Sequence, residues 1–84
     1  MKYQLLKNKN AIITGCNKGI GKAILTEYAS NGANCIGCVR KNSEEFLLYC
    51  KKLEKENNVN INIVEMDLKD NKTISEAVKK IFNI

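Results

Sequence analysis

The fold of this 84-residue chain is decided by one stretch, Thr14-Gly15-Cys16-Asn17-Lys18-Gly19-Ile20-Gly21. Its three glycines have the spacing G-x-x-x-G-x-G, and they follow a short apolar run at residues 10–14. Apolar runs bounded by glycine are typical of strands that are buried on both faces. A turn from such a strand into a helix presents unpaired N–H groups and a partial positive charge. The stretch therefore predicts a turn that binds phosphate.

The segment after the turn, from about Gly19 to Asn31, has the periodicity of an amphipathic helix. Gly21, early in this helix, would let it lie close against the strands. Gly32 follows the last turn, where a left-handed C-cap is expected. The residues expected to form the buried stripe of this helix are Ile20, Ala23, Ile24 and Tyr28.

Downstream, the same alternation of strand and helix recurs twice. Residues 34–39 and 59–66 read as the second and third strands. Asn42 and Glu45 form a candidate capping box for the second helix, and Asp70 or Thr73 is expected to cap the third. The inner side of the second helix is expected to comprise Phe46, Tyr49, Cys50 and Leu53. The corresponding residues of the third helix are Ile74, Ala77, Val78 and Ile81.

This alternation predicts an α/β fold with the order βαβαβα. Strands separated by helices are parallel, and right-handed crossovers place the helices on the sheet. We therefore expect a three-stranded parallel sheet in the order 3-2-1, which is half of a Rossmann fold. Residues 1–84 are expected to form one partial nucleotide-binding domain.

The pattern T-G-x-x-x-G-I-G between a strand and a helix resembles the cofactor turn of the short-chain dehydrogenase/reductase family, particularly its 3-oxoacyl-carrier-protein-reductase-like members. The resemblance spans essentially the whole chain. It implies an oxidoreductase that binds a nicotinamide dinucleotide through the turn. Extended epimerases and dehydratases typically show T-G-x-x-G-x-x-G, and Lys18 stands here at the middle glycine. The candidate cofactor-binding residues of the turn are Gly15, Cys16, Asn17, Lys18, Gly19, Ile20 and Gly21.

The end of the second strand favours NADP(H) over NAD(H). NAD-binding Rossmann units carry an acidic residue there, about 20 positions beyond the glycines. Here the sequence is Val39-Arg40-Lys41, and Arg40 is the only arginine of the chain. A guanidinium can hold the 2′-phosphate of NADP with paired charge-assisted hydrogen bonds, which a carboxylate would repel. We expect Arg40 and Lys41 at this phosphate, and Lys18 could reach it from the other side.

At the end of the third strand the resemblance implies a site for the adenine. Asp67 would bond the adenine amino group, and Leu68 would flank the ring. On the residues alone, an aspartate at a strand end is often only a cap for the next helix.

The catalytic residues of this family lie on the fourth and later strands and the helices that follow them. These are a Tyr-x-x-x-Lys pair with a serine and an asparagine. Tyr3 and Lys7 match the spacing of that pair, but they precede the first strand and no serine accompanies them. We therefore expect no catalytic residue here, and an inactive 84-residue chain. The full-length protein is expected to act on a carbonyl or hydroxyl substrate, as a homo-oligomer. The alternative is a non-catalytic module that binds or senses NADP(H).

Composition bears on three further questions, which are nucleic-acid binding, membrane association and the state of the cysteines. The net charge is +5, from 14 basic and 9 acidic residues, but the lysines are scattered, which argues against nucleic-acid binding. No apolar run approaches the ~20 residues that span a bilayer, so we expect a cytoplasmic protein without a membrane partner. Cys35 and Cys38 are three apart in a strand and would point to opposite faces. With no histidine in the chain, four free thiols are expected rather than a metal site or a disulfide.

Overall fold

The computed structural model describes residues 5–83, which contain three strands and three helices in alternation. Neighbouring strands are parallel and β2 lies between β1 and β3, so the predicted order 3-2-1 is confirmed. The third strand is shorter at both ends than predicted. In chain order the elements are β1 (Asn10–Thr14), α1 (Gly19–Ser30), β2 (Asn34–Val39), α2 (Glu44–Asn57), β3 (Ile61–Glu65) and α3 (Asn71–Phe82).

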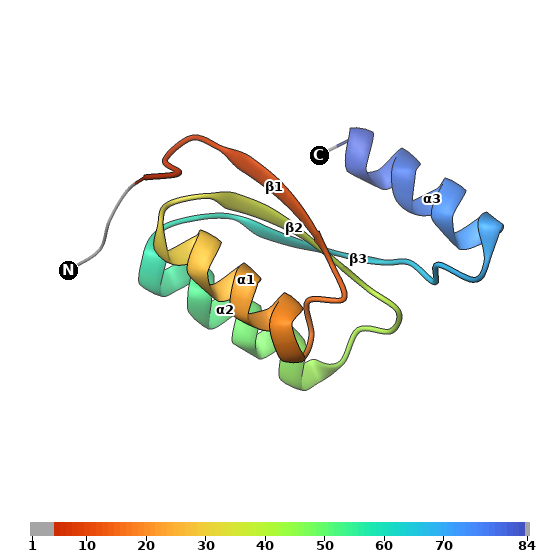
Figure 1. Cartoon of the computed structure of the whole chain (residues 1–84), viewed down its shortest axis with the longest axis horizontal. Helices are drawn as coiled ribbons and strands as arrows, with labels where there is room; N and C mark the ends of the chain where they lie inside the picture. Colours follow the sequence, from red (N-terminus) through yellow and green to blue (C-terminus); the bar gives the residue numbers. More distant parts are fainter. Residues whose placement is uncertain (1–4, 84) are drawn as a thin grey trace.

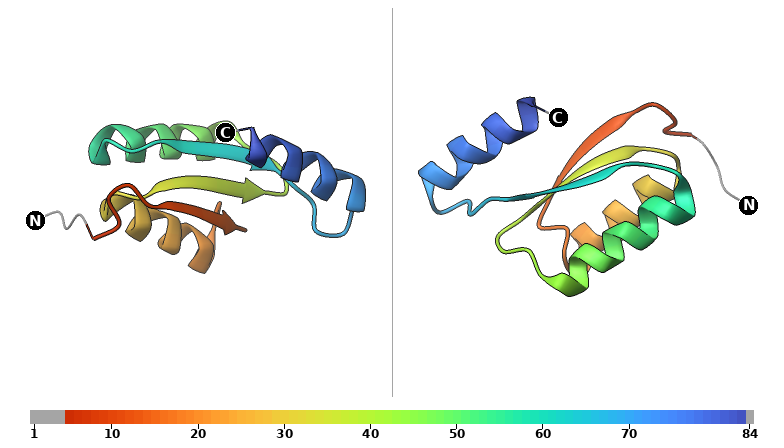
Figure 2. Two further views of the ribbon diagram at one scale, coloured as in Figure 1. Left: turned by 90° about the horizontal axis from the view of Figure 1, so that it is seen from above. Right: turned by 180° about the vertical axis from the view of Figure 1, so that it is seen from behind.

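The helices cover both faces of the sheet. Helices α1 and α2 lie side by side on one face, and α3 lies on the other (Figure 1, Figure 2). The larger core cluster fills the space under α1 and α2, where Leu25 and Phe46 are buried. A smaller cluster of Cys38, Val64 and Ala77 lies under α3. Because the strands are parallel, all three carboxyl ends meet at one edge of the sheet.

The cysteines are free thiols inside these clusters. Cys35 belongs to the larger cluster and Cys38 to the smaller, which confirms that the C-x-x-C residues point to opposite faces. Burial raises the pKa of the Cys16 thiol to about 11 and that of Cys50 to about 12. Within residues 5–83, no cluster of histidine, cysteine or acidic side chains could hold a metal ion.

The predicted stripe of α1 is wrong. Ile20 is 81% exposed, whereas Leu25 and Ala29 are fully buried. The contacting face of α1 runs through Gly21, Leu25 and Ala29, each four residues after the last, because Gly21 packs against the turn before the helix. A glycine adds nothing to a hydrophobic pattern, so the apolar residues alone placed the stripe one position out of phase.

The predicted capping box of α2 is also wrong. Ser43, not Asn42, is the N-cap, and its hydroxyl oxygen accepts a hydrogen bond from the backbone N–H of Phe46. The backbone N–H of Asn42 instead donates to the carboxylate of Glu65, at 2.9 Å. Asn42 is thus held beside β3, and the helix begins one residue later than the pattern indicated.

At the other helix ends the predictions are largely confirmed. Gly32 has φ +91°, in the left-handed region, and follows Asn31, the C-cap residue of α1. Asp70 caps α3 by accepting a hydrogen bond from the N–H of Lys72. Ala77 is buried, but Val78 is exposed, because α3 contacts the sheet along a narrow strip centred on Ala77.

Strand β1 forms one edge of the described sheet, since β2 is its only partner there. Lys9 accepts a hydrogen bond from Asn34 N–H, and Gly15 N–H donates to the Cys38 carbonyl. Because these groups alternate in direction along a strand, the peptide N–H and C=O of Ile12 point away from β2. Its side chain is 59% exposed. An open apolar edge of this kind promotes pairing with another chain.

We predict that the 84-residue chain self-associates through this edge, and that Ile12→Lys reduces the association. A charge on an edge strand opposes strand pairing because it must be desolvated. The matched control is Leu48→Lys on α2, a residue that is also 59% exposed but lies on a helix. Sedimentation velocity would measure both variants. A monomeric wild-type chain, or an equal effect of the two substitutions, would contradict the prediction.

Candidate functional site

The glycine-rich turn joins the carboxyl end of β1 to the start of α1. Gly15 and Gly19 both have φ +60°, a conformation that side chains with a Cβ resist. At each of them, a Cβ would meet no other atom within 4 Å. The space in front of these two glycines is therefore open, and no group of residues 5–83 fills it.

The start of α1 has no negative partner of its own. Lys18 is the N-cap residue, and no side chain accepts a hydrogen bond there. The first turn of the helix carries no acidic residue. Its partial positive charge and free N–H groups therefore face the open side of the turn, which is the arrangement that binds an anion.

Gly21 sets how closely α1 approaches the turn. A Cβ on Gly21 would lie 2.2 Å from the carbonyl oxygen of Gly15 and 2.8 Å from its carbon. Both are backbone atoms, so they cannot turn aside as a flexible side chain could. A close approach at Gly21 was predicted and is present, but the contact is with the turn and not with the strands.

The remaining side chains of the turn point in different directions. Asn17, Lys18 and Ile20 are exposed, whereas Cys16 is completely buried. The Cys16 thiol lies 3.8 Å from the carbonyl oxygen of Cys38 and donates a weak hydrogen bond to it. Only the backbone of Cys16 is therefore available to a ligand.

The ends of the three strands form a shallow hollow of about 210 Å³ beside the turn. Of the predicted site residues, Gly15, Arg40, Asp67 and Leu68 line it. Lys18 and Lys41 are not among the lining residues. Sequence reasoning missed the other four, although the first three lie at or next to a strand end; they are Thr14, Cys38, Met66 and Lys69.

Within this hollow, Arg40 and Asp67 face each other. The Nε atom of Arg40 lies 3.5 Å from Oδ2 of Asp67, and the Arg40 side chain is 79% exposed. Ion pairs this exposed contribute little stability and break easily. A more highly charged group, such as a phosphate, could therefore displace Asp67 as the partner of Arg40 at a small cost in free energy.

Two further contacts hold Asp67 in place, and neither was predicted. The backbone N–H of Lys69 donates to Oδ1 of Asp67 at 3.0 Å. The Thr73 hydroxyl, on α3, accepts a hydrogen bond from the N–H of Asp67, at 3.0 Å, and lies 2.9 Å from its carbonyl oxygen. Thr73 was a candidate helix cap in the sequence. Here Asp70 is the cap, and the Thr73 hydroxyl braces the segment between β3 and α3 through Asp67 and the Asp70 carbonyl.

A second hollow, of about 220 Å³, lies between the turn and the start of α2. Asn17, Lys22, Ser43 and Tyr49 are among its lining residues. The Lys22 ammonium lies 4.3 Å from the centre of the Tyr49 ring, and the Tyr49 hydroxyl is hydrogen-bonded to Thr26. These contacts tie α1 to α2 near the turn.

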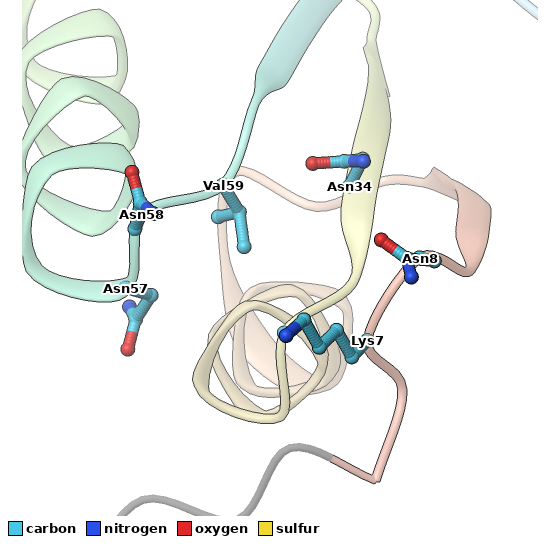
Figure 3. Close-up of a pocket in the computed structure, with 7 residues that line it drawn as sticks. Lys7, Asn8, Asn34, Asn57, Asn58 and Val59 are labelled. Carbon is cyan, nitrogen blue, oxygen red and sulfur yellow. The ribbon is translucent and has the colours of Figure 1, made fainter.

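Another hollow, of about 340 Å³, lies at the amino-terminal ends of the strands (Figure 3). Lys7, Asn8, Asn34 and Asn58 are among the residues that line it. It shares no residue with the turn or with the strand ends that carry Arg40 and Asp67. The groups suited to an anion, which are the glycine-rich turn and Arg40, thus lie at the carboxyl ends of the strands. Tyr3, of the Tyr3–Lys7 spacing match, lies outside the described residues.

Comparison with known proteins agrees with this geometry. A family model described as short chain dehydrogenase matches residues 9–84. The chain belongs to this family. Among its relatives, an uncharacterised oxidoreductase of Schizosaccharomyces pombe is 32% identical over 79 residues, covering 94% of this chain and 30% of the relative. An NADPH-dependent pterin aldehyde reductase of Arabidopsis thaliana is 30% identical over 87% of this chain and 29% of its own length.

The structural comparison finds proteins with the same fold. The L-sorbose reductase of Gluconobacter frateurii, solved with NADPH and L-sorbose, superimposes with a TM-score of 0.79 at 26% identity. The match covers 96% of this chain and 30% of the reductase. The 84 residues thus span about 30% of the length of the proteins they match. Within the described residues, no helix has both the length and the apolar character needed to cross a membrane.

We predict that Gly21→Ala destabilises the protein by about 1–3 kcal/mol, as overpacking typically does. In an ordinary helix the same change would stabilise by about 1 kcal/mol. The sign reverses because the new Cβ would collide with the carbonyl group of Gly15. Urea denaturation would measure the free energy of unfolding.

A control for helix propensity is Ala23→Gly, at an exposed position of α1. It should cost only about 1 kcal/mol. If Gly21→Ala were as stable as the wild type, or more so, the close contact between α1 and the turn would be wrong.

Proposed function

We propose that the chain is the NADP(H)-binding segment of an oxidoreductase that reduces a carbonyl, or oxidises an alcohol, by hydride transfer. The observation that carries the proposal is the hollow shared by Gly15, Arg40 and Asp67. It combines a turn that favours anions with the single guanidinium of the chain. The names of two matched proteins, the pterin aldehyde reductase and the NADPH-bound L-sorbose reductase, support both the cofactor and the carbonyl substrate.

The residues present fit a dinucleotide phosphate. The space before Gly15 and Gly19 is open, and the helix start beside it has no acidic neighbour in its first turn. Peptide N–H groups between Gly15 and Gly21 would bind the pyrophosphate, with Asn17 and Ile20 contributing through their backbone. A ligand pyrophosphate placed there gains from the helix dipole without any change in the protein.

The cations near the strand ends would distinguish NADP(H) from NAD(H). Arg40 would exchange Asp67 for the 2′-phosphate, to which a guanidinium can donate two hydrogen bonds. Lys18, exposed on the turn, and Lys41, next to Arg40, would add positive charge on either side. Asp67, once released, would accept a hydrogen bond from the adenine amino group, and Leu68 would cover the ring.

When bound, the reduced nicotinamide supplies the hydride. In this proposal the 84 residues bind and orient the cofactor, and the proton donor for the substrate oxygen comes from elsewhere in a longer protein. The 84-residue chain alone would therefore bind NADPH without reducing a carbonyl. Within the family, the T-G-x-x-x-G-I-G pattern favours the 3-oxoacyl-carrier-protein-reductase-like branch.

The test is titration of the chain with NADPH and NADH, for the wild type and for Arg40→Ala. The wild type should prefer NADPH. The substitution should raise the Kd for NADPH about tenfold or more, since hydrogen bonds to charged groups are the strongest of their kind, and should leave the Kd for NADH nearly unchanged.

The matched control is Lys51→Ala, which removes one exposed positive charge from α2, outside the hollow. It should change the affinity for NADPH by less than about twofold, because exposed charges at a distance are screened. Equal wild-type affinity for the two dinucleotides would contradict the NADP(H) assignment. Absence of binding to either one would contradict the proposed function as a whole.

A further inference from the structure

Cys16 is the one side chain of the glycine-rich turn that points into the core. It is completely buried in the larger cluster, between the turn and β2. Its sulfur lies 2.8 Å from the place that a Cβ on Gly37 would occupy. Gly37 is the residue of β2 that pairs with Ile13 in β1. The sulfur thus occupies space that a side chain at position 37 would otherwise need.

This fit depends on the sulfur alone. The next-nearest atoms to a Cβ at position 37 are the Asn62 carbonyl oxygen, at 3.9 Å, and Cζ of Phe46, at 4.0 Å. Both distances are ordinary van der Waals contacts, which a real side chain would tolerate. Position 37 therefore excludes a side chain only because Cys16 is there, and the two residues are matched in size.

The turn is consequently supported from two sides. On one side Gly21 brings α1 against the peptide of Gly15. On the other, the Cys16 thiol rests over Gly37 and donates to the carbonyl of Cys38. The same carbonyl accepts the N–H of Gly15, at 2.9 Å. Without the sulfur, a cavity would open directly beneath the peptides of residues 15–17.

We propose that Cys16 is a positioning residue for the cofactor: its sulfur, seated over Gly37, holds the amides of the turn in the geometry that binds pyrophosphate. This inference rests on the proposed function for its ligand. Preset amides bind an anion more tightly than mobile ones, because their ordering cost is met on folding. The thiol acts as a neutral space filler, since burial keeps it protonated at neutral pH.

The experiment combines two substitutions, Cys16→Ala and Gly37→Ala, singly and together. Two quantities are measured for each variant, the Kd for NADPH and the hydrogen-exchange rate of the amides in residues 15–21. Each single substitution should weaken NADPH binding about fivefold or more and speed the exchange, by opening a cavity or by pushing the turn outward. The double variant should return to within about threefold of the wild type, as coupled neighbours do.

Two further variants separate positioning from general stability. Cys16→Ser keeps a side chain of similar size and should retain NADPH affinity within about threefold. Cys50→Ala removes an equally buried sulfur of the same cluster, on α2. It should lower the free energy of unfolding but leave the Kd of the folded protein within about twofold, because Cys50 belongs to α2 and its sulfur does not occupy the space over Gly37.

The inference is overturned if the increase in the Kd for NADPH in the double variant equals the product of the increases in the two single variants. It is also overturned if Cys50→Ala weakens binding as much as Cys16→Ala. If Gly37→Ala does not fold, the inference is tested by the other three variants. It then requires that Cys16→Ala binds NADPH more weakly than both Cys16→Ser and the double variant. If the wild type binds no NADPH, the proposed function fails, and the exchange rates test the support by Cys16 separately: unchanged rates in the single variants would refute it.

Discussion

Gly21 brings the first turn of α1 against the carbonyl group of Gly15, at a separation that leaves no room for a side chain. This contact determines where the helix begins relative to β1 and directs its free N–H groups to the carboxyl edge of the sheet. It also selects the face of α1 that is buried, through Leu25 and Ala29. The turn, the larger core cluster and the candidate site therefore share one steric constraint.

The parallel sheet then gathers the charged residues. Since all three strands end at the same edge, Arg40 after β2 and Asp67 after β3 come within 3.5 Å of each other, beside Gly15. Their ion pair is exposed and weak, so it keeps the guanidinium near the turn but can break when a ligand binds. An edge with a helix N-terminus and an exchangeable arginine is suited to a ligand with two phosphate groups a short distance apart.

Much of this arrangement follows from the sequence, because glycine spacing and apolar runs report directly on turns and strands. The element order, the parallel sheet, a close approach at Gly21 and the opposite faces of Cys35 and Cys38 were all predictable. The buried face of α1 was not, because glycine marks that face without adding hydrophobicity. Ser43, and not the predicted Asn42, caps α2. The Asn42 backbone N–H instead donates a hydrogen bond to Glu65, which is distant in sequence.

Contacts between distant elements had no signal in the sequence. The bracing of Asp67 by Thr73 and the contact of Lys22 with Tyr49 each depend on how two elements meet. The match between Cys16 and Gly37 is of the same kind, since the two residues are 21 positions apart and neither is unusual in its own element. Such pairs become visible only when the positions of the backbones are known.

The central claim is that the backbone amides of the glycine-rich turn bind the pyrophosphate. Nuclear magnetic resonance of the ¹⁵N-labelled chain, titrated with NADPH, tests it most directly. The largest shift changes should fall on the amides of residues 15–21, with smaller ones near Asp67. Unmoved amides in the turn at saturating NADPH, or changes centred on the hollow beside Asn58 at the amino-terminal ends of the strands, would contradict the account.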